Sequence, residues 1–428
     1  MKIIHTTDQS FDKERARLRA REATVDREIR RAVEDIISDV ARRGDEALFE
    51  YTKRFDGTVI DGENIEVSAD EIEEAVAGID ESDLSILQEA ARRIEVFHRK
   101  QVAETWLDSD EEGIELGQLV TPIGRVGIYA PGGLAAYPST VLMAAIPAKV
   151  AGVGEICLVS PAREGTIHPL VLAAARLSGV DRVFRIGGAQ AVAALAHGTE
   201  SVPPVDKIVG PGNVYVATAK MLVFGKVGID MIAGPSEIVI ISDGTADAAV
   251  AAADLLSQAE HDPMASALLL TPSAEFARRV AAEVQAQLSV LTRQSIARAA
   301  IEEFGAVIVT RDMDEAVNIS NSFAPEHLEL MVENPRELLH GIRNAGAVFL
   351  GLNTPEAVGD YMAGPNHILP TGGTARFSSP LGVYDFIKRT SVISFSPEAL
   401  RRYGRSVVRF AELEGLEAHG RSVLARME

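Results

Sequence analysis

The sequence is short of cysteine and lacks an apolar run that could cross a membrane. Its single cysteine, Cys157, excludes an intrachain disulfide. Cys157 lies in the apolar run EICLVS, so we interpret it as a small buried side chain on a strand rather than a nucleophile. The longest apolar stretch, 141–159, is interrupted by Pro147, Lys149 and Glu155 and cannot be a membrane helix. The first residues show no signal-peptide pattern, and we expect a cytoplasmic protein.

Positive charge is also in deficit. The chain has 42 Lys and Arg against 62 Asp and Glu, a net charge of −20. This balance favours solubility and argues against nucleic acid or an anionic membrane as a partner. The acidic residues form no long tail, so they indicate a solvated surface. A chain of 428 residues is longer than one simple hydrophobic core usually serves, which predicts at least two domains.

The first quarter of the chain is highly charged and patterned as helices. The segment ATVDREIRRAVEDIISDVARRG predicts an amphipathic helix that ends at Gly44. Its apolar stripe consists of Val25, Ile29, Val33, Ile36, Ile37 and Val40. The segments ADEIEEAVAGI and SDLSILQEAARRIEVFHRK repeat the pattern, with Ser68 and Ser82 as predicted helix caps.

The pattern changes near residue 121, where short apolar strands begin to alternate with helices. The predicted strands are RVGIYAP, EICLVSP, RVFRIGG, KIVGPGN, EIVIISDG, ASALLLTP and AVIVT. This alternation predicts parallel βαβ units and an α/β fold of two similar modules. The last stretch, from about Leu381, is polar and predicts an irregular arm without its own core.

Several predicted strands end in glycine-containing turns. These are APGG (130–133), IGGAQ (186–190), VGPGN (209–213) and AGPSE (233–237). Such turns let backbone amides approach a phosphate at a helix N-terminus. However, GxGxxG and P-loop motifs are missing, and tight turns alone also explain these glycines. Tyr129, Gln190 and Asn213 lie beside the turns and are candidates for nucleotide contacts.

Four scattered polar residues make a candidate metal-binding set. They are Gln258 and His261 in DLLSQAEHDP, Asp360 in EAVGDYMAGPNH and His419 in LEGLEAHGRS. Two imidazoles, a carboxylate and an amide oxygen suit Zn²⁺. Gln258 and His261 lie roughly 60° apart on a helix and can reach one point. Ordinary roles at a helix end, in a turn or on a solvated face remain open for each.

Two further pairs are candidates for handling a substrate. Glu326 and His327, in SFAPEHLEL, could transfer protons if a bend lets both line one pocket. The alternative is the first turn of a helix after Pro325. Glu414 and His419 are five residues apart, about 140° round a helix, so one regular helix could not aim both at one ion. They could instead flank a small substrate.

The longer motifs together carry a resemblance to a known family. They are PGGLAAYPSTVLM, GGAQAVAALAHGTESVPPVDKIVGPGNVYVATAK, IDMIAGPSE, DLLSQAEHDP, NSFAPEHLEL, GDYMAGPNHILPT and ARFSSPLGVYDFIKRTSV. In this order, from about residue 25 onward, the chain resembles the histidinol dehydrogenases. The resemblance implies a homodimer with one Zn²⁺ per subunit. Such an enzyme oxidises L-histidinol through L-histidinaldehyde to L-histidine with two NAD⁺.

The resemblance also implies roles for individual residues. The zinc ligands would be Gln258, His261, Asp360 and His419. The acid–base pair would be Glu326 and His327. The substrate contacts would be Ser236, His327, Asp360, Glu414 and the metal ligands. The NAD contacts would be Tyr129, Gln190 and Asn213. Because the family's C-terminal arm reaches the neighbouring site, Glu414 and His419 would serve the partner subunit.

The expected architecture is a domain-swapped homodimer of two incomplete Rossmann-like modules with short terminal arms. The N-terminal arm would be 1–24 and the C-terminal arm 382–428. The first α/β domain would combine 25–128 with 237–381, and the second, NAD-binding domain would be 129–236.

The expected mechanism has zinc anchoring the substrate, neutral His327 as general base and Glu326 activating water for aldehyde oxidation. The lone Cys157 agrees with a water route. From the residues alone three other classes remain. They are another zinc-containing NAD-dependent alcohol or aldehyde dehydrogenase, a zinc hydrolase that needs no NAD⁺, and a metal-binding protein that forms no NADH. The breadth of the motif match favours a histidinol dehydrogenase.

Overall fold

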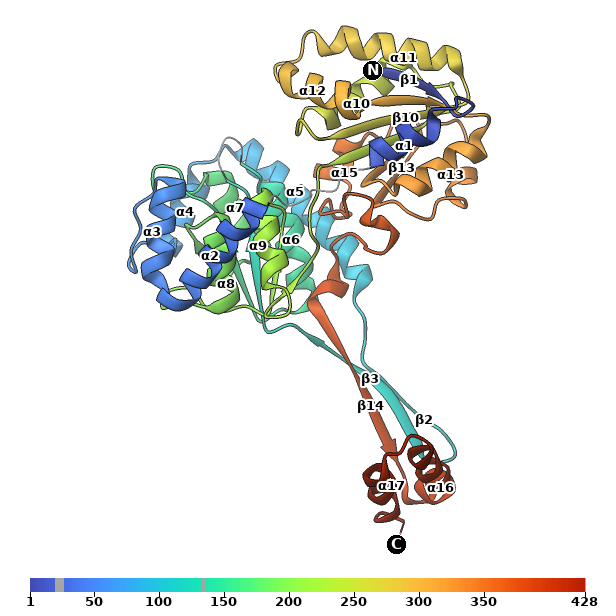
Figure 1. The fold of residues 1–428 in the computed structure, drawn as a ribbon. Helices are drawn as coiled ribbons and strands as arrows, with labels where there is room; N and C mark the ends of the chain where they lie inside the picture. The colour runs from blue at the N-terminus through green and yellow to red at the C-terminus, as the bar shows by residue number, and fades with distance from the viewer. Residues whose placement is uncertain (20–26, 133–135, 428) are drawn as a thin grey trace.

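Two parallel sheets and a long arm make up the computed structural model, which describes residues 1–19, 27–132 and 136–427 (Figure 1). Val25 of the predicted stripe and Gly133 of the APGG turn lie outside the described residues. Within these ranges, no helix combines the length and apolar character needed to span a bilayer.

The first sheet has the strand order β1-β11-β10-β9-β12-β13. Its strands are β1 (Lys2–His5), β9 (Glu237–Ile241), β10 (Ser266–Thr271), β11 (Ala306–Val309), β12 (His327–Leu330) and β13 (Ala347–Leu350). Successive side chains face opposite layers, so Ile238 and Ile240 pack with one set of helices and Val239 and Ile241 with the other. The first set is α10 (Ala248–Ala259), α11 (Ala274–Leu288) and α12 (Gln294–Phe304); the second is α1 (Phe11–Arg19) and α13 (Met313–Phe323). Both faces of the sheet are therefore covered.

The second sheet has the strand order β6-β5-β4-β7-β8. Its strands are β4 (Arg125–Tyr129), β5 (Glu155–Val159), β6 (Arg182–Phe184), β7 (Lys207–Val209) and β8 (Gly228–Ile229). One face packs on α5 (Glu81–His98), α6 (Pro138–Ala151) and α7 (Pro169–Ser178), with α4 (Ala69–Ala77) outside α7. The other packs on α2 (Arg27–Arg43), α3 (Asp45–Asp56), α8 (Gly188–His197) and α9 (Val214–Val223). Cys157 is fully buried on β5, as predicted, and burial raises the pKa of its thiol to about 12.

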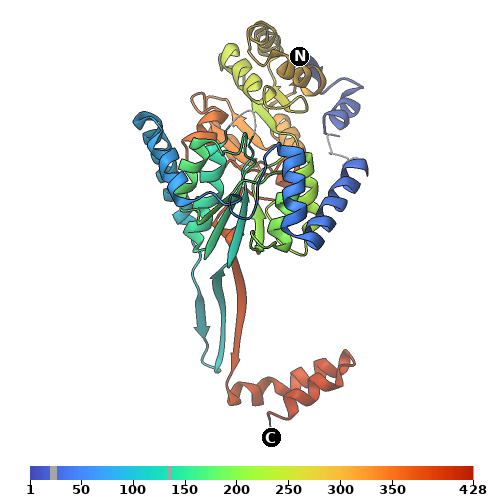
Figure 2. The ribbon, with the colours of Figure 1, turned by 90° about the vertical axis from the view of Figure 1, so that its left-hand side faces the viewer.

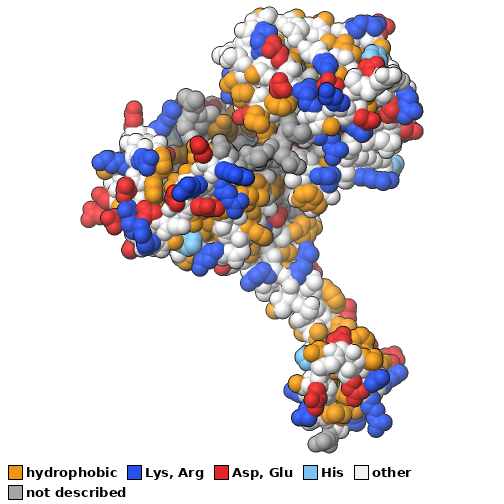
Figure 3. Space-filling view, viewed as in Figure 1, with side chains coloured by type: hydrophobic (Ala, Val, Ile, Leu, Met, Phe, Trp, Pro, Cys, Tyr) orange, Lys and Arg blue, Asp and Glu red, His pale blue; other side chains and the backbone are white. Residues whose placement is uncertain are grey.

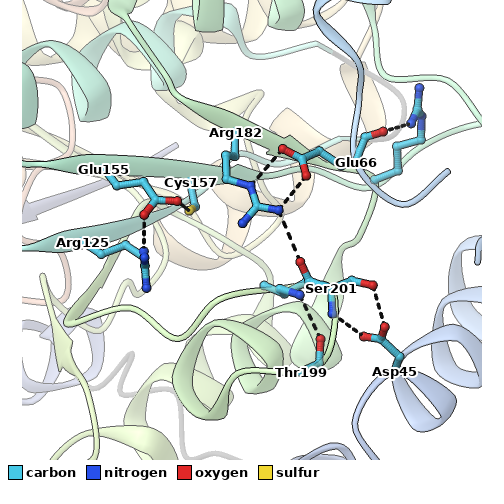
Figure 4. A network of polar contacts seen from close by, with 10 residues as sticks. Asp45, Glu66, Arg125, Glu155, Cys157, Arg182, Thr199 and Ser201 are labelled. Atoms are coloured by element: carbon cyan, nitrogen blue, oxygen red, sulfur yellow. Dashed lines mark hydrogen bonds and ion pairs between the residues drawn. The ribbon is translucent and has the colours of Figure 1, made fainter. Parts of the chain in front are cut away.

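The helical region before residue 128 belongs to the second sheet, not to the first as expected. The stripe of Val33, Ile36 and Val40 packs on the alanine-rich side of α8 and α9. Polar contacts reinforce this, since Arg182 donates to Glu66 through Nε at 2.9 Å and through Nη2 at 2.6 Å (Figure 4). An amphipathic pattern shows that a helix covers a core, but it does not show which core.

The N-terminus also differs from its expected role as an arm. Strand β1 pairs in parallel with β11, with Ile4 opposite Ile308, and extends the first sheet. Among the helix caps, Ser68 forms the predicted capping box with Glu71. Ser82 does not cap α5, because Asp80 occupies the N-cap position one residue before the helix begins.

The C-terminal segment is regular, so the prediction of an irregular arm is wrong. Strand β14 (Ile387–Phe395) pairs antiparallel with β3 (Ile114–Pro122), which also pairs with β2 (Trp106–Ser109). Helices α16 (Pro397–Leu413) and α17 (Glu417–Leu424) follow at the far end. Figures 1 and 2 both show this unit projecting away from the two sheets. We call β2, β3, β14, α16 and α17 the arm.

Asp56 at the end of α3 is a half-buried carboxylate that faces the start of α8. Gln190 donates from Nε2 to Asp56 Oδ2 at 3.3 Å. Burial raises the pKa of Asp56 to about 6, although a hydrogen bond from the backbone N–H of Gly187 opposes the rise. The folded protein therefore holds this proton more tightly than the unfolded chain does.

We expect the contribution of Asp56 to stability to fall as pH rises. Its ordinary pKa is 3.8, so between about pH 4 and pH 6 the unfolded chain has released the proton that the folded protein retains. Asp56→Asn should match the wild type near pH 4 and be more stable by about 1–2 kcal/mol at pH 7.5, after allowance for partial solvent screening. Urea denaturation at both pH values measures the difference. A difference that does not change with pH would contradict the assignment.

Candidate active site

A cavity of about 410 Å³ lies between the two sheets. The second sheet contributes the carboxyl ends of its strands, through Pro131 after β4 and the turn 210–213 after β7. The first sheet contributes amino ends, through Ser236 before β9 and His327 at the start of β12. We call these the second-sheet wall and the first-sheet wall.

The two walls present opposite ends of helices to the cavity. On the second-sheet wall, α6 begins at Pro138 and α9 begins at Val214. On the first-sheet wall, α10 ends at Ala259 and α15 (Glu356–Tyr361) ends beside Asp360. Helix N-termini favour anions and C-termini favour cations. The second-sheet wall therefore suits a phosphate-bearing ligand, and the first-sheet wall suits a metal ion or an amine.

The second-sheet wall also contains a change in strand order. From β4 the chain builds outward through β5 and β6, and then returns to place β7 on the other side of β4. Ligands of open α/β sheets bind in the crevice at such a switch point. The turn 210–213 lies at this crevice.

Glu326 and His327 are buried side by side on the first-sheet wall, with only 6% and 4% of their surfaces exposed. Strand β12 begins at His327, so the alternative of a helix start at Pro325 is wrong. Glu326 Oε2 accepts the backbone N–H of Glu237 at 3.0 Å. Burial nevertheless raises the pKa of Glu326 well above its ordinary value.

The hydrogen bonds of His327 fix its tautomer. Its Nδ1 lies 3.1 Å from the carbonyl oxygen of Glu237 and 3.1 Å from Gln258 Oε1. Both are acceptors, so Nδ1 carries the proton and Nε2 is left as the proton acceptor. Burial lowers the pKa of His327 to about 3, which keeps the ring neutral at physiological pH.

Three of the four expected zinc ligands line this cavity. Gln258 and His261 come from the end of α10, and Asp360 comes from α15. Gln258 is fully buried, and its Nε2 has no hydrogen-bond partner among the described residues. An amide oxygen has two lone pairs, so Gln258 Oε1 can accept the proton of His327 Nδ1 and still bind a cation. The donor set fits Zn²⁺.

Within the described part of one chain, Glu414 and His419 lie elsewhere. Both are exposed at the end of the arm, beside a second cavity of about 540 Å³ that includes Phe395 and Phe410. Glu414 caps the end of α16, whereas His419 lies on α17. The two residues therefore do not share one helix, and they can face the same side.

Of the expected cofactor contacts, only Asn213 lines the cavity, and its side chain also caps α9. Tyr129 and Gln190 are buried behind the second-sheet wall. The Tyr129 hydroxyl accepts the backbone N–H of Gly188 at 3.2 Å. In this structure the two side chains support the turn 186–190.

The sequence pattern missed two side chains of the first-sheet wall. Glu356 Oε1 lies 3.7 Å from His327 Nδ1, and ligand atoms of His327, Glu356 and Asp360 lie within 4.8 Å of one another. His367 Nδ1 lies 3.0 Å from the carbonyl oxygen of Asp360. Glu356 and Asp360 are four residues apart on α15, so reading this segment as a helix would have placed both on one face.

Comparison with known proteins agrees with the geometry. A family model described as histidinol dehydrogenase matches residues 19–427. The chain is 59% identical to the histidinol dehydrogenase of Geobacter metallireducens, covering 100% of this chain and 98% of the relative. It is 58% identical to that of Syntrophotalea carbinolica, covering 100% and 99%.

A solved structure extends the agreement to the fold. The crystal structure of histidinol dehydrogenase from Elizabethkingia anophelis matches with a TM-score of 0.94 at 38% identity, covering 100% of this chain and 98% of that one. The family model and the relatives span both sheets and the arm. The chain therefore belongs to the histidinol dehydrogenase family.

Proposed function

We propose that the protein oxidises L-histidinol through L-histidinaldehyde to L-histidine with two NAD⁺, in the cavity between the sheets. As a histidinol dehydrogenase it is an NAD-dependent oxidoreductase of histidine biosynthesis. The buried pair Glu326 and His327 carries the proposal, because it lies opposite a wall suited to a dinucleotide. We also propose a cytoplasmic location, since one buried cysteine suits a reducing compartment.

The metal would be held on the first-sheet wall by Gln258, His261 and Asp360, with His419 supplied by a second copy of the chain. When bound, Zn²⁺ would anchor the imidazole and amine of the substrate. The helix C-termini at this wall and the buried amide oxygen of Gln258 support a cation here. One zinc per subunit is proposed, because the described part of the chain has one such wall.

His327 would act as the base in both oxidation steps. Its Nε2 would accept the hydroxyl proton of the alcohol, and later that of the aldehyde hydrate, as each hydride leaves for NAD⁺. The imidazolium that forms would be stabilised by the carboxylates of Glu326 and Glu356, whose oxygens lie 3.8 Å and 3.7 Å from Nδ1. The bond from Nδ1 to Glu237 holds the ring in place.

Glu326 would activate the water that attacks the aldehyde. Its Oε2 accepts the backbone N–H of Glu237, and the Ser236 side chain also hydrogen-bonds to this carboxyl group. The carboxylate so held would accept a proton from water. A pKa raised by burial makes the carboxylate a stronger base than one in solvent. Cys157 is buried in the second sheet, away from this pair, so a thiol adduct has no role.

The arm would complete the site of a second copy in a domain-swapped homodimer. Large apolar side chains near its end are exposed, including Ile393 at 70%, Phe410 at 66% and Leu413 at 69%. Figure 3 shows hydrophobic side chains at this surface. A second chain would cover them and would receive Glu414 and His419, with Glu414 placed to contact the substrate amine. Ser236 would contact the substrate from the wall itself.

The proposal predicts two NADH per molecule of L-histidinol. NADH absorbance would be followed with limiting L-histidinol before chelation, after chelation and after zinc is restored. Activity should disappear on chelation and return with zinc. One NADH per substrate would indicate a simple zinc-containing alcohol dehydrogenase. Bound zinc without NADH formation would favour a hydrolase or a metal-binding protein.

Glu326→Gln should separate the two oxidation steps. Loss of the water-activating carboxylate should slow oxidation of L-histidinaldehyde about 10²-fold or more, with a smaller effect on alcohol oxidation. Rapid-mixing kinetics with each compound as the starting substrate measures both rates. His327→Asn serves as the comparison, because it should slow both steps. Equal losses in Glu326→Gln would remove the assigned role of this residue.

Mixed dimers should test the arm exchange. His327→Ala removes the base from the cavity, and His419→Ala removes the zinc ligand from the arm. Neither homodimer should therefore oxidise L-histidinol. In a mixed dimer, the intact cavity of the arm variant would receive the intact arm of the cavity variant. Co-expression should therefore recover activity, measured after tandem affinity purification of the mixed species. An inactive mixed dimer would show that each arm serves its own chain.

A further inference from the structure

A buried ion pair lies at the second-sheet wall of the cavity. Lys220 on α9 pairs with Asp230, just after β8, and only 3% and 1% of their side chains are exposed. Both residues line the cavity. The free energy lost by removing two charges from water offsets much of the free energy gained from their attraction. A contribution to stability is therefore a weak explanation for such a buried pair. The contacts of the pair with the backbone indicate its role.

The pair holds Gly210 from both sides. Lys220 Nζ donates to the carbonyl oxygen of Gly210 at 2.8 Å, and Asp230 Oδ2 accepts the N–H of Gly210 at 2.8 Å. Gly210 has a φ of 111°, and a Cβ there would lie 2.2 Å from the carbonyl oxygen of Tyr129. The peptide is thus pressed against the end of β4 in a conformation that favours glycine. The ion pair determines where the turn 210–213 begins.

The same pair fixes a second segment. Asp230 Oδ1 accepts the backbone N–H of Met231 at 2.7 Å. From Met231 the chain crosses to the first sheet and reaches Ser236 just before β9. At the far end of this crossing, the N–H of Gly234 donates to Thr371 Oγ1 at 2.6 Å. One ion pair therefore joins the turn at the switch point to the start of the link between the walls.

We infer that Lys220 and Asp230 are positioning residues for NAD⁺. They hold the turn 210–213 so that its backbone and Asn213 meet the cofactor, and they fix the link that leads to Ser236. A pair of opposite charges suits this role, because one member satisfies a carbonyl and the other satisfies N–H groups. The inference rests on the proposed location of the cofactor at the second-sheet wall.

The test is direct NAD⁺ binding to the full-length, zinc-loaded enzyme by calorimetry. Lys220→Met removes the contact to the Gly210 carbonyl, and we expect the Kd and the KM for NAD⁺ to rise about tenfold or more. Zinc content should stay near wild type, because the expected zinc ligands lie on the first-sheet wall or the arm. Since Lys220→Met leaves a buried carboxylate unpaired, the neutral double variant Lys220→Met/Asp230→Asn is measured in parallel and should show the same rise.

Arg125→Met is the matched control. Arg125 pairs with Glu155 at 2.6 Å and donates to the carbonyl oxygen of Pro204 at 3.0 Å, but at the amino edge of the same sheet (Figure 4). The Kd of the Arg125→Met variant for NAD⁺ should be unchanged. An unchanged Kd in both Lys220 variants, or an equal rise in Arg125→Met, overturns the inference. Asn213→Ala then distinguishes failure of this inference from failure of the proposed cofactor site. A raised Kd for NAD⁺ in Asn213→Ala would still place the cofactor at the second-sheet wall. An unchanged Kd would reject that location as well.

Discussion

Two parallel sheets face one cavity with opposite edges, and the chemistry of the site depends on this arrangement. In a parallel sheet all flanking helices run the same way, so each edge collects helix ends of one polarity. The second sheet presents N-termini and the first presents C-termini. Each helix end contributes typically about 0.3–1 kcal/mol toward a suitable charge. The helix ends thus favour an anionic ligand at one wall and a cation at the facing wall, before any side chain is considered.

The first-sheet wall buries several carboxyl groups close together. Glu326 and Glu356 are buried there, and burial raises the pKa of each well above its ordinary value. Glu329 lies behind them, and burial together with the nearby charge of Asp254 raises its pKa to about 8. A bound cation lowers the cost of charging such groups. A metal bound at this wall, as proposed, would therefore also stabilise the wall.

Much of this architecture follows from the sequence, because buried strands of parallel sheets are continuous apolar runs between glycine turns. EIVIIS and ICLVS are such runs, and both are central strands. The sequence does not show which sheet an amphipathic helix covers, so the helices within 25–128 were assigned to the wrong core. Glu326 and His327 were identified by motif, whereas Glu356 depended on recognising α15 as a helix. The motif match also did not show that His419 lies on α17 at the end of the arm, outside the cavity that holds the other three expected ligands.

With the arm exchanged as proposed, the activity of the enzyme would depend on its own concentration. A separated subunit would keep its walls and its acid–base pair but would lack the histidine that its partner's α17 carries. Dilution below the dimer dissociation constant would therefore reduce zinc affinity and turnover together, by mass action. Zinc, by joining side chains of two subunits, would in turn favour assembly. Metal supply, subunit concentration and activity then form one linked equilibrium.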